Sequence, residues 1–121
     1  MTASRGSPQE YFPKFKAGLP LVDQVVFSGS GMEMFHATYL AARKQQMQGC
    51  VTDLMFYLNA DPALLAVPRI PIHLYHGLAD TIVPPRSSEL LAELWPWAKL
   101  SLIPGEGHFS LPVLHLKKIL D

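Results

Sequence analysis

The chain has 121 residues, equal numbers of basic and acidic side chains (10 each), and 49% hydrophobic residues. This length predicts one domain, and the balanced charge excludes a global attraction to nucleic acid or to an acidic membrane surface. A single cysteine excludes an internal disulfide and fits a reducing compartment. No apolar stretch approaches the length of a membrane span, and residues 1–8 lack the apolar core of a secretory signal. These features together predict a cytoplasmic protein.

The first half of the chain predicts short helices. Residues 1–8 are polar and predict a disordered lead, and residues 9–66 predict a helical segment. Within it, Glu10–Ala17 has a short apolar face of one or two turns, which Pro13 interrupts. Leu21–Phe27 is too short for its periodicity to separate a helix from a strand.

Two longer helical patterns follow. Ser28–Gly31 interrupts the helical pattern. We expect Ser30 to cap the next helix, with Glu33 as its capping-box partner. Cys50–Asn59 predicts a further helix. Cys50 then lies in helical sequence with no histidine nearby, which favours a small apolar residue over a nucleophile.

Residues 67–121 predict a strand, a helix, a second strand and a closing helix. The apolar run Ile72–Tyr75 leads to Gly77 and suits a buried strand, and Lys99–Ile103 suits a second one. Pro84 and Pro85 open the helix between them. We expect Ser110 to cap the closing helix. The residues expected on its buried face are Val113, Leu116 and Leu120.

An acid and an imidazole follow the two predicted strands. Asp80 comes three residues after Gly77, and His108 comes after the turn Pro104–Gly107. Parallel strands joined by a helix leave both loops at the same edge of the sheet, where open α/β sheets bind ligands. Either residue alone is explained more simply, Asp80 as a turn residue and His108 as a core or surface histidine. Together they favour a catalytic pair, in which a carboxylate orients an imidazole that moves protons for a nucleophile.

The stretches HGLADTIVPP and LSLIPGEGHFSL resemble the C-terminal end of the α/β-hydrolases. In that family, H-G-x-x-D-x-x-V-P carries the triad acid and P-G-x-G-H carries the triad histidine. The resemblance implies that Asp80 is the acid and His108 the base. It covers the last half of the chain, and the first half is similar to the helical cap that often precedes these strands. The implied fold class is α/β, a partial α/β-hydrolase fold with N-terminal helices, a parallel strand-helix-strand unit and a C-terminal helix.

The third member of the triad is missing. The family's nucleophile lies in G-x-S-x-G, upstream of the acid, and this sequence contains no such motif. The nearest text, Phe27–Gly31, places its glycines directly beside Ser28 and Ser30, which favours a turn. The family's oxyanion-hole loop is missing too. The chain is therefore similar to the last third of a hydrolase, with two triad members and no nucleophile.

The remaining polar residues predict neither a metal site nor a cofactor. His73 and His76 are three apart on a predicted strand, so their side chains point to opposite faces, which argues against a shared metal ion. His76 suits a structural role at the end of the strand. Glu106 can tune the pKa of His108 through its charge, or can be a solvated turn carboxylate. No phosphate-binding loop or dinucleotide-binding motif is present.

Two functions are compatible with this pattern. In the first, the chain supplies Asp80 and His108 of a Ser-His-Asp triad for ester or acyl hydrolysis; it is inactive alone and acts on a small acyl substrate once a nucleophile segment completes it. In the second, it is a non-catalytic, truncated hydrolase that acts by association. Two parallel strands have unpaired edges, which favour a homo-oligomer or a partner chain.

Overall fold

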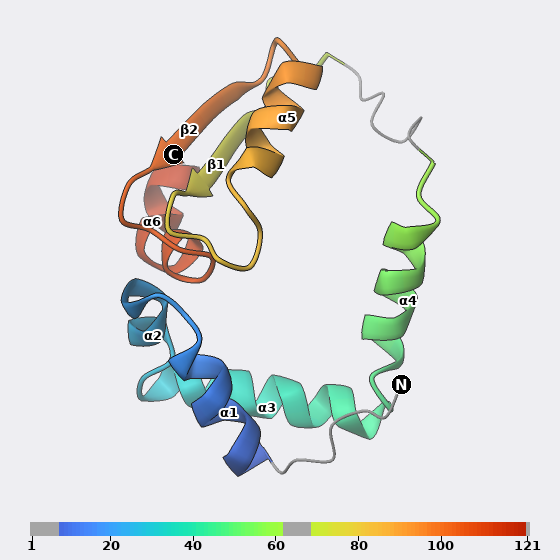
Figure 1. Cartoon of the computed structure of the whole chain (residues 1–121), viewed down its shortest axis with the longest axis vertical. Coiled ribbons are helices and arrows are strands. Elements are labelled where there is room, and N and C mark those ends of the chain that lie inside the picture. The colour runs from blue at the N-terminus through green and yellow to red at the C-terminus, as the bar shows by residue number, and fades with distance from the viewer. Residues whose placement is uncertain (1–7, 62–68, 121) are drawn as a thin grey trace.

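The computed structural model describes residues 8–61 and 69–120 and has a mixed α/β fold, as the sequence predicts. Helices precede two parallel strands that are joined by a helix, and a last helix closes the chain (Figure 1). The elements are α1 (Pro8–Ala17), α2 (Leu21–Val26), α3 (Ser30–Lys44), α4 (Gln48–Leu58), β1 (His73–Gly77), α5 (Arg86–Leu94), β2 (Lys99–Ile103) and α6 (Ser110–Leu120). The expected turn after Asp61 and the expected boundary between residues 66 and 67 lie outside the described residues, as do residues 1–7.

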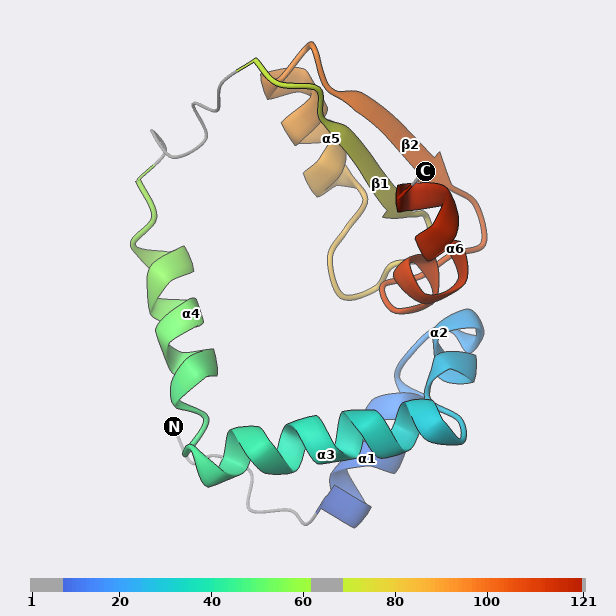
Figure 2. The ribbon, with the colours of Figure 1, turned by 180° about the vertical axis from the view of Figure 1, so that it is seen from behind.

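The elements form two groups, with α4 apart from both. Helices α1, α2 and α3 lie together, and the strands lie between α5 on one face and α6 on the other (Figures 1 and 2). The two groups meet where α2 approaches α6. No helix in residues 8–61 and 69–120 has both the length and the apolar character that crossing a membrane requires.

The two strands run parallel in a simple register. His73 pairs with Lys99 and Gly77 pairs with Ile103. The N–H of Lys99 donates to the carbonyl of Ile72 over 2.9 Å, and the N–H of Leu78 donates to the carbonyl of Ile103 over 3.0 Å. Both strands therefore end at the same edge of the sheet, where the loops that carry Asp80 and His108 begin.

Aromatic rings join the N-terminal helices to the loop after β2. Phe109 follows His108 and lies with its ring 4.8 Å from that of Phe27, at an interplanar angle of 78°. Phe27 in turn contacts Phe35 of α3 and Phe15 of α1. Phe27 is 4% exposed and belongs to the small buried core. The cluster therefore holds the histidine loop against the helical segment.

Helices α1 and α3 differ from the sequence-based expectations, and α2 settles a segment that the sequence left open. Helix α1 begins at Pro8 and continues through Pro13, because the proline ring fits helical φ and the ring costs such a short helix only one backbone bond. The ambiguous segment after Pro20 is a helix, α2. Ser30 does not cap α3: Gly29, at φ 53°, is the N-cap, and Ser30 is already the first helical residue.

Helix α6 differs in its cap and in its burial. Ser110 is its first residue and does not cap it, and its own N–H donates to a carboxylate from α2, described below. The face predicted to be buried is exposed: Val113 by 58%, Leu116 by 53% and Leu120 by 75%. The buried residues are Ser110 and Leu111, because two strands offer this helix only a narrow surface near its start.

A substitution at Gly77 tests how closely the end of β1 approaches the loop after β2. A Cβ at this position would overlap the backbone carbonyl of Glu106, whereas one at Gly49 in α4 would meet nothing within 4 Å. We expect Gly77→Ala to lower the free energy of unfolding by about 1–3 kcal/mol through overpacking. The matched control Gly49→Ala should be neutral or stabilising by up to about 1 kcal/mol, because alanine favours a helix. Urea unfolding measures both, and equal effects of the two variants would contradict the close approach.

Candidate active site

Asp80 follows β1 on a loop that fixes its carboxylate. Oxygen Oδ1 accepts hydrogen bonds from the backbone N–H groups of Ile82, over 2.8 Å, and Val83, over 2.9 Å. This is the local turn that aspartate favours, in which the side chain binds the backbone two or three residues ahead. The second oxygen, Oδ2, remains available to side chains from other elements. The Asp80 side chain is 5% exposed.

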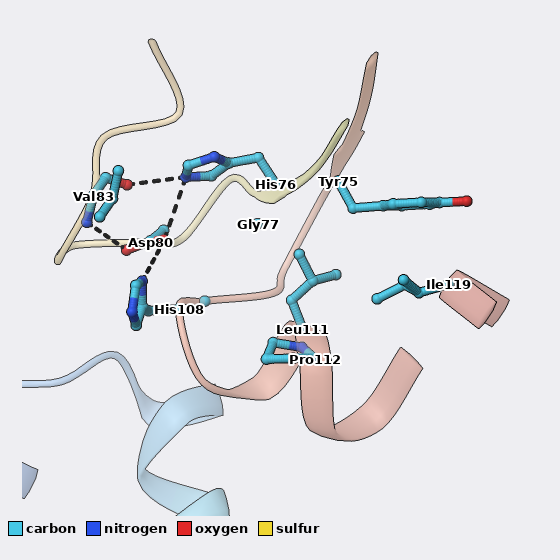
Figure 3. Close-up of a pocket in the computed structure, with 10 residues that line it drawn as sticks. Tyr75, His76, Gly77, Asp80, Val83, His108, Leu111, Pro112 and Ile119 are labelled. Atoms are coloured by element: carbon cyan, nitrogen blue, oxygen red, sulfur yellow. Dashed lines mark hydrogen bonds and ion pairs between the residues drawn. The ribbon is translucent and has the colours of Figure 1, made fainter. Parts of the chain in front are cut away.

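His108 lies on the neighbouring loop and binds that second oxygen. Its Nδ1 is 3.0 Å from Oδ2 of Asp80 (Figure 3). An ionised carboxylate only accepts hydrogen bonds, so Nδ1 carries the proton. In the neutral ring the lone pair is then on Nε2, which binds no described residue. With 35% of its side chain exposed, His108 can receive a proton from another molecule.

His76 is a second histidine beside the same carboxylate. Its Nε2 donates to the carbonyl of Val83 over 3.0 Å and also lies 3.3 Å from Oδ2 of Asp80. Because a carbonyl only accepts, Nε2 carries the proton, and in the neutral ring Nδ1 accepts from the hydroxyl of Ser88 over 2.6 Å. His76 thereby ties the Asp80 loop to α5. The sequence suggested such a supporting role but not its partners.

Two opposing effects act on the pKa of Asp80. Burial raises it, but the N–H of Val83, the ring of His108 and the N–H of Ile82 lower it by more. The pKa of Asp80 therefore lies below that of an ordinary carboxyl group, and the side chain is ionised at neutral pH. An ionised acid is what an orienting partner for imidazole requires.

A pocket of about 470 Å³ lies beside the acid and the base. Its described lining residues are Tyr75, His76, Gly77, Asp80, Val83, Gly107, His108, Leu111, Pro112 and Ile119 (Figure 3). No serine, threonine or cysteine is among them. Ser28 donates instead to the carbonyl of Val25 over 2.6 Å, Ser30 begins α3, and Cys50 is exposed on α4. The described part of the chain thus brings an acid and a base together without a nucleophile.

Asp23 is the residue that the sequence did not reveal. Its side chain is fully buried, at 0% exposure, and its carboxylate accepts hydrogen bonds from the backbone N–H groups of His108, Phe109 and Ser110, over 2.9, 3.0 and 2.8 Å. These N–H groups lie 85 to 87 positions further along the chain. The only signal in the sequence is one acid in the apolar stretch that became α2, and that signal names no partner.

Glu106 contacts α6 and is not the solvated turn carboxylate that was one of its two expected roles. Its Oε1 lies 2.9 Å from Nε2 of His115 on α6, and its side chain is 14% exposed. The hydrogen bonds from His115 and from Ser110 lower the pKa of Glu106. It is therefore a largely buried carboxylate paired with His115, and not a solvated one. Among the described residues, no cluster of three metal-binding side chains occurs.

The lowered pKa of Asp80 predicts how stability depends on pH. Its ionised form stabilises the fold above the ordinary carboxyl pKa of about 4, and this contribution is lost as the pH falls below that value. At pH 7 we expect Asp80→Asn to lower the free energy of unfolding by about 1–3 kcal/mol, as expected for hydrogen bonds to a charged group. The difference should shrink as the pH is lowered below 4.

Urea unfolding at a series of pH values measures this difference. Asp53→Asn, which changes an exposed carboxylate on α4, is the matched control and should change little at any pH. A difference between Asp80→Asn and the parent that stays constant down to about pH 3 would contradict the assignment.

Comparisons with known proteins identify no relative of this chain. Searches against protein-family models, curated proteins and solved structures found no match to this chain. The acid, the base and the pocket beside them are therefore the features that bear on function.

Proposed function

We propose that this chain supplies the acid and the base of a Ser-His-Asp triad for ester or acyl hydrolysis, as the C-terminal portion of an α/β-hydrolase. The observation that carries the proposal is the 3.0 Å contact between Nδ1 of His108 and Oδ2 of Asp80. Asp80 holds the ring in one tautomer, and Nε2 takes the proton of an attacking hydroxyl. The motif H-G-x-x-D-x-x-V-P at His76–Pro84 and the motif P-G-x-G-H at Pro104–His108 support the same roles.

The nucleophile has to come from outside the described residues. In the hydrolases that the chain resembles, it lies on a strand-to-helix turn in the motif G-x-S-x-G. A second polypeptide with that motif would place its serine beside Nε2 of His108, and a small acyl substrate would occupy the adjoining pocket. A neighbouring reading frame that encodes G-x-S-x-G supports this proposal, and its absence favours a non-catalytic relic.

A fluorophosphonate probe, which reacts with an activated serine, tests the proposed triad in the complex of this chain with such a partner. We expect the partner's serine to be labelled, and Asp80→Asn or His108→Ala to slow the labelling on the order of 10⁴-fold. His73→Ala, which removes an exposed histidine on β1, is the control and should not slow it. Equal labelling with His108→Ala would contradict the proposal.

The chain by itself should not hydrolyse p-nitrophenyl esters above the background rate, because an acid and a base without a nucleophile and an oxyanion site give little catalysis. Turnover that disappears in His108→Ala would overturn this expectation. It would point to Ser28, Ser30 or Cys50 as a nucleophile within the chain.

A second candidate function is association through the sheet, as a truncated relic or an interaction module. Ladder bonds at Ile72 and Leu78 face β2, so by alternation the backbone groups of His73 and Tyr75 face the free edge of β1. Helix α4 also exposes large apolar side chains, including Phe56 by 61% and Leu58 by 72%. Free strand edges and exposed apolar surface both favour association.

Sedimentation velocity tests association, and we expect dimers or larger species at micromolar concentration. His73→Pro removes an N–H at the free edge while leaving the β1–β2 ladder intact, so it should weaken association by about ten-fold or more, roughly the loss of one well-placed hydrogen bond. His73→Ala, which loses the same side chain but keeps the N–H, is the control and should leave association unchanged. A compact monomer at all concentrations would contradict this candidate.

A further inference from the structure

The loop that carries His108 is held by a carboxylate from a distant helix. Asp23 of α2 binds the N–H of His108 through Oδ2, over 2.9 Å, and the N–H groups of Phe109 and Ser110 through Oδ1, over 3.0 and 2.8 Å. Its side chain is 0% exposed, so these bonds replace the water that a carboxylate would otherwise bind. No cationic side chain in the described ranges pairs with it. The three N–H groups therefore compensate the charge of Asp23. In return, the negative charge stabilises the N-terminus of α6.

The same loop is enclosed on its other side by β1. Gly77 leaves room for the carbonyl of Glu106, which accepts a hydrogen bond from the N–H of Ala79 over 2.8 Å. A Cβ at Gly107 would overlap the carboxylate of Asp23. The backbone that leads into His108 thus lies between β1 and α2, with little freedom to move toward or away from either.

We propose that Asp23 is the positioning residue of the base: by binding the backbone of His108, it fixes the direction from which the ring reaches Asp80. The inference rests on the proposed role of the Asp80–His108 pair and adds a support to it. The hydrogen bond to Asp80 fixes Nδ1 of the imidazole ring. The hydrogen bond from the backbone N–H of His108 to Asp23 fixes the main chain of the same residue. Active-site groups are held to within about 0.5 Å, and a shift of about 1 Å can cost about 10²-fold in rate.

This assignment also gives the N-terminal helices a role. Helix α2 carries Asp23, the group that holds the backbone of the base. The ring of Phe109, between His108 and Ser110, packs on Phe27 just after α2 and reinforces the same contact. Displacing α2 would therefore displace the base even though Asp80 and β1 stayed in place.

The proton on Nδ1 of His108 provides a readout that a purely stabilising role would not change. A hydrogen bond to a carboxylate slows the exchange of this proton with water and makes it visible by proton NMR. We expect one slowly exchanging ring proton in the parent chain, lost in Asp80→Asn, which identifies it. In Asp23→Asn an amide NH₂ replaces one acceptor oxygen and opposes a backbone N–H, so the loop should shift and this proton should exchange at least about ten-fold faster.

The backbone amides of β1 and β2 serve as the internal reference, and Asp53→Asn on α4 is the matched control. Retained protection of the strands, together with faster exchange of the ring proton in Asp23→Asn but not in Asp53→Asn, supports a positioning role. A ring proton that exchanges at the parental rate in Asp23→Asn overturns it, while its loss in Asp80→Asn would still support the acid–base pair. In the complex with a serine partner, Asp23→Asn should slow fluorophosphonate labelling about 10²-fold, whereas Asp53→Asn should not.

Native-state hydrogen exchange of the unmodified chain decides the question if Asp23→Asn does not fold. We expect the ring proton of His108 and the amides of residues 108–110 to exchange through one common opening, with the same dependence on low denaturant. A ring proton that exchanges through a separate, easier opening than those amides would overturn the inference.

Discussion

The structure depends on how the loop between β2 and α6 is held. On one side it meets Gly77, whose missing side chain lets the two loops touch. On the other side it binds the buried carboxylate of Asp23. The two neighbours come from opposite halves of the chain, so the loop is where the helical segment and the β-α-β unit become one structure. His108 lies at this junction, so its position depends on contacts from both halves of the chain.

The two carboxylate oxygens of Asp80 bind different partners. Backbone N–H groups bind Oδ1 and fix the side chain, and Oδ2 faces the rings of His108 and His76. This arrangement keeps Asp80 ionised and leaves Nε2 of His108 with a lone pair beside a pocket. This geometry fits the base that we propose, and no serine or threonine is among the described residues that line the pocket. The free edges of the two-stranded sheet and the exposed apolar side chains of α4 favour association, which is the second function that we propose.

Local sequence patterns predicted the two strands and the helix between them. Two apolar runs separated by a helical pattern predicted the parallel strands, and the order of the chain then predicted that Asp80 and His108 leave the sheet at one edge. Longer-range properties did not follow from the sequence. The periodicity of Val113, Leu116 and Leu120 predicted a buried face, but burial also requires an element to cover it, and two strands do not.

The role of Asp23 could not be predicted for a related reason. A buried carboxylate needs donors, and its donors are backbone N–H groups, which every residue but proline has and which leave no trace in the sequence. Ser110 was the expected cap because it stands at the start of α6, yet a residue from α2 supplies the acceptor. Contacts between residues so far apart depend on how the two halves of the chain pack.

The protonation state of the two ring nitrogens of His108 decides whether Asp80 orients this imidazole. Long-range proton–nitrogen correlation spectra distinguish a protonated from an unprotonated ring nitrogen in the neutral imidazole. We predict that Nδ1 carries the proton, bound to Asp80, and that Nε2 is unprotonated. A neutral ring protonated on Nε2 would mean that Asp80 does not orient His108, and it would contradict the pairing on which the proposed function rests.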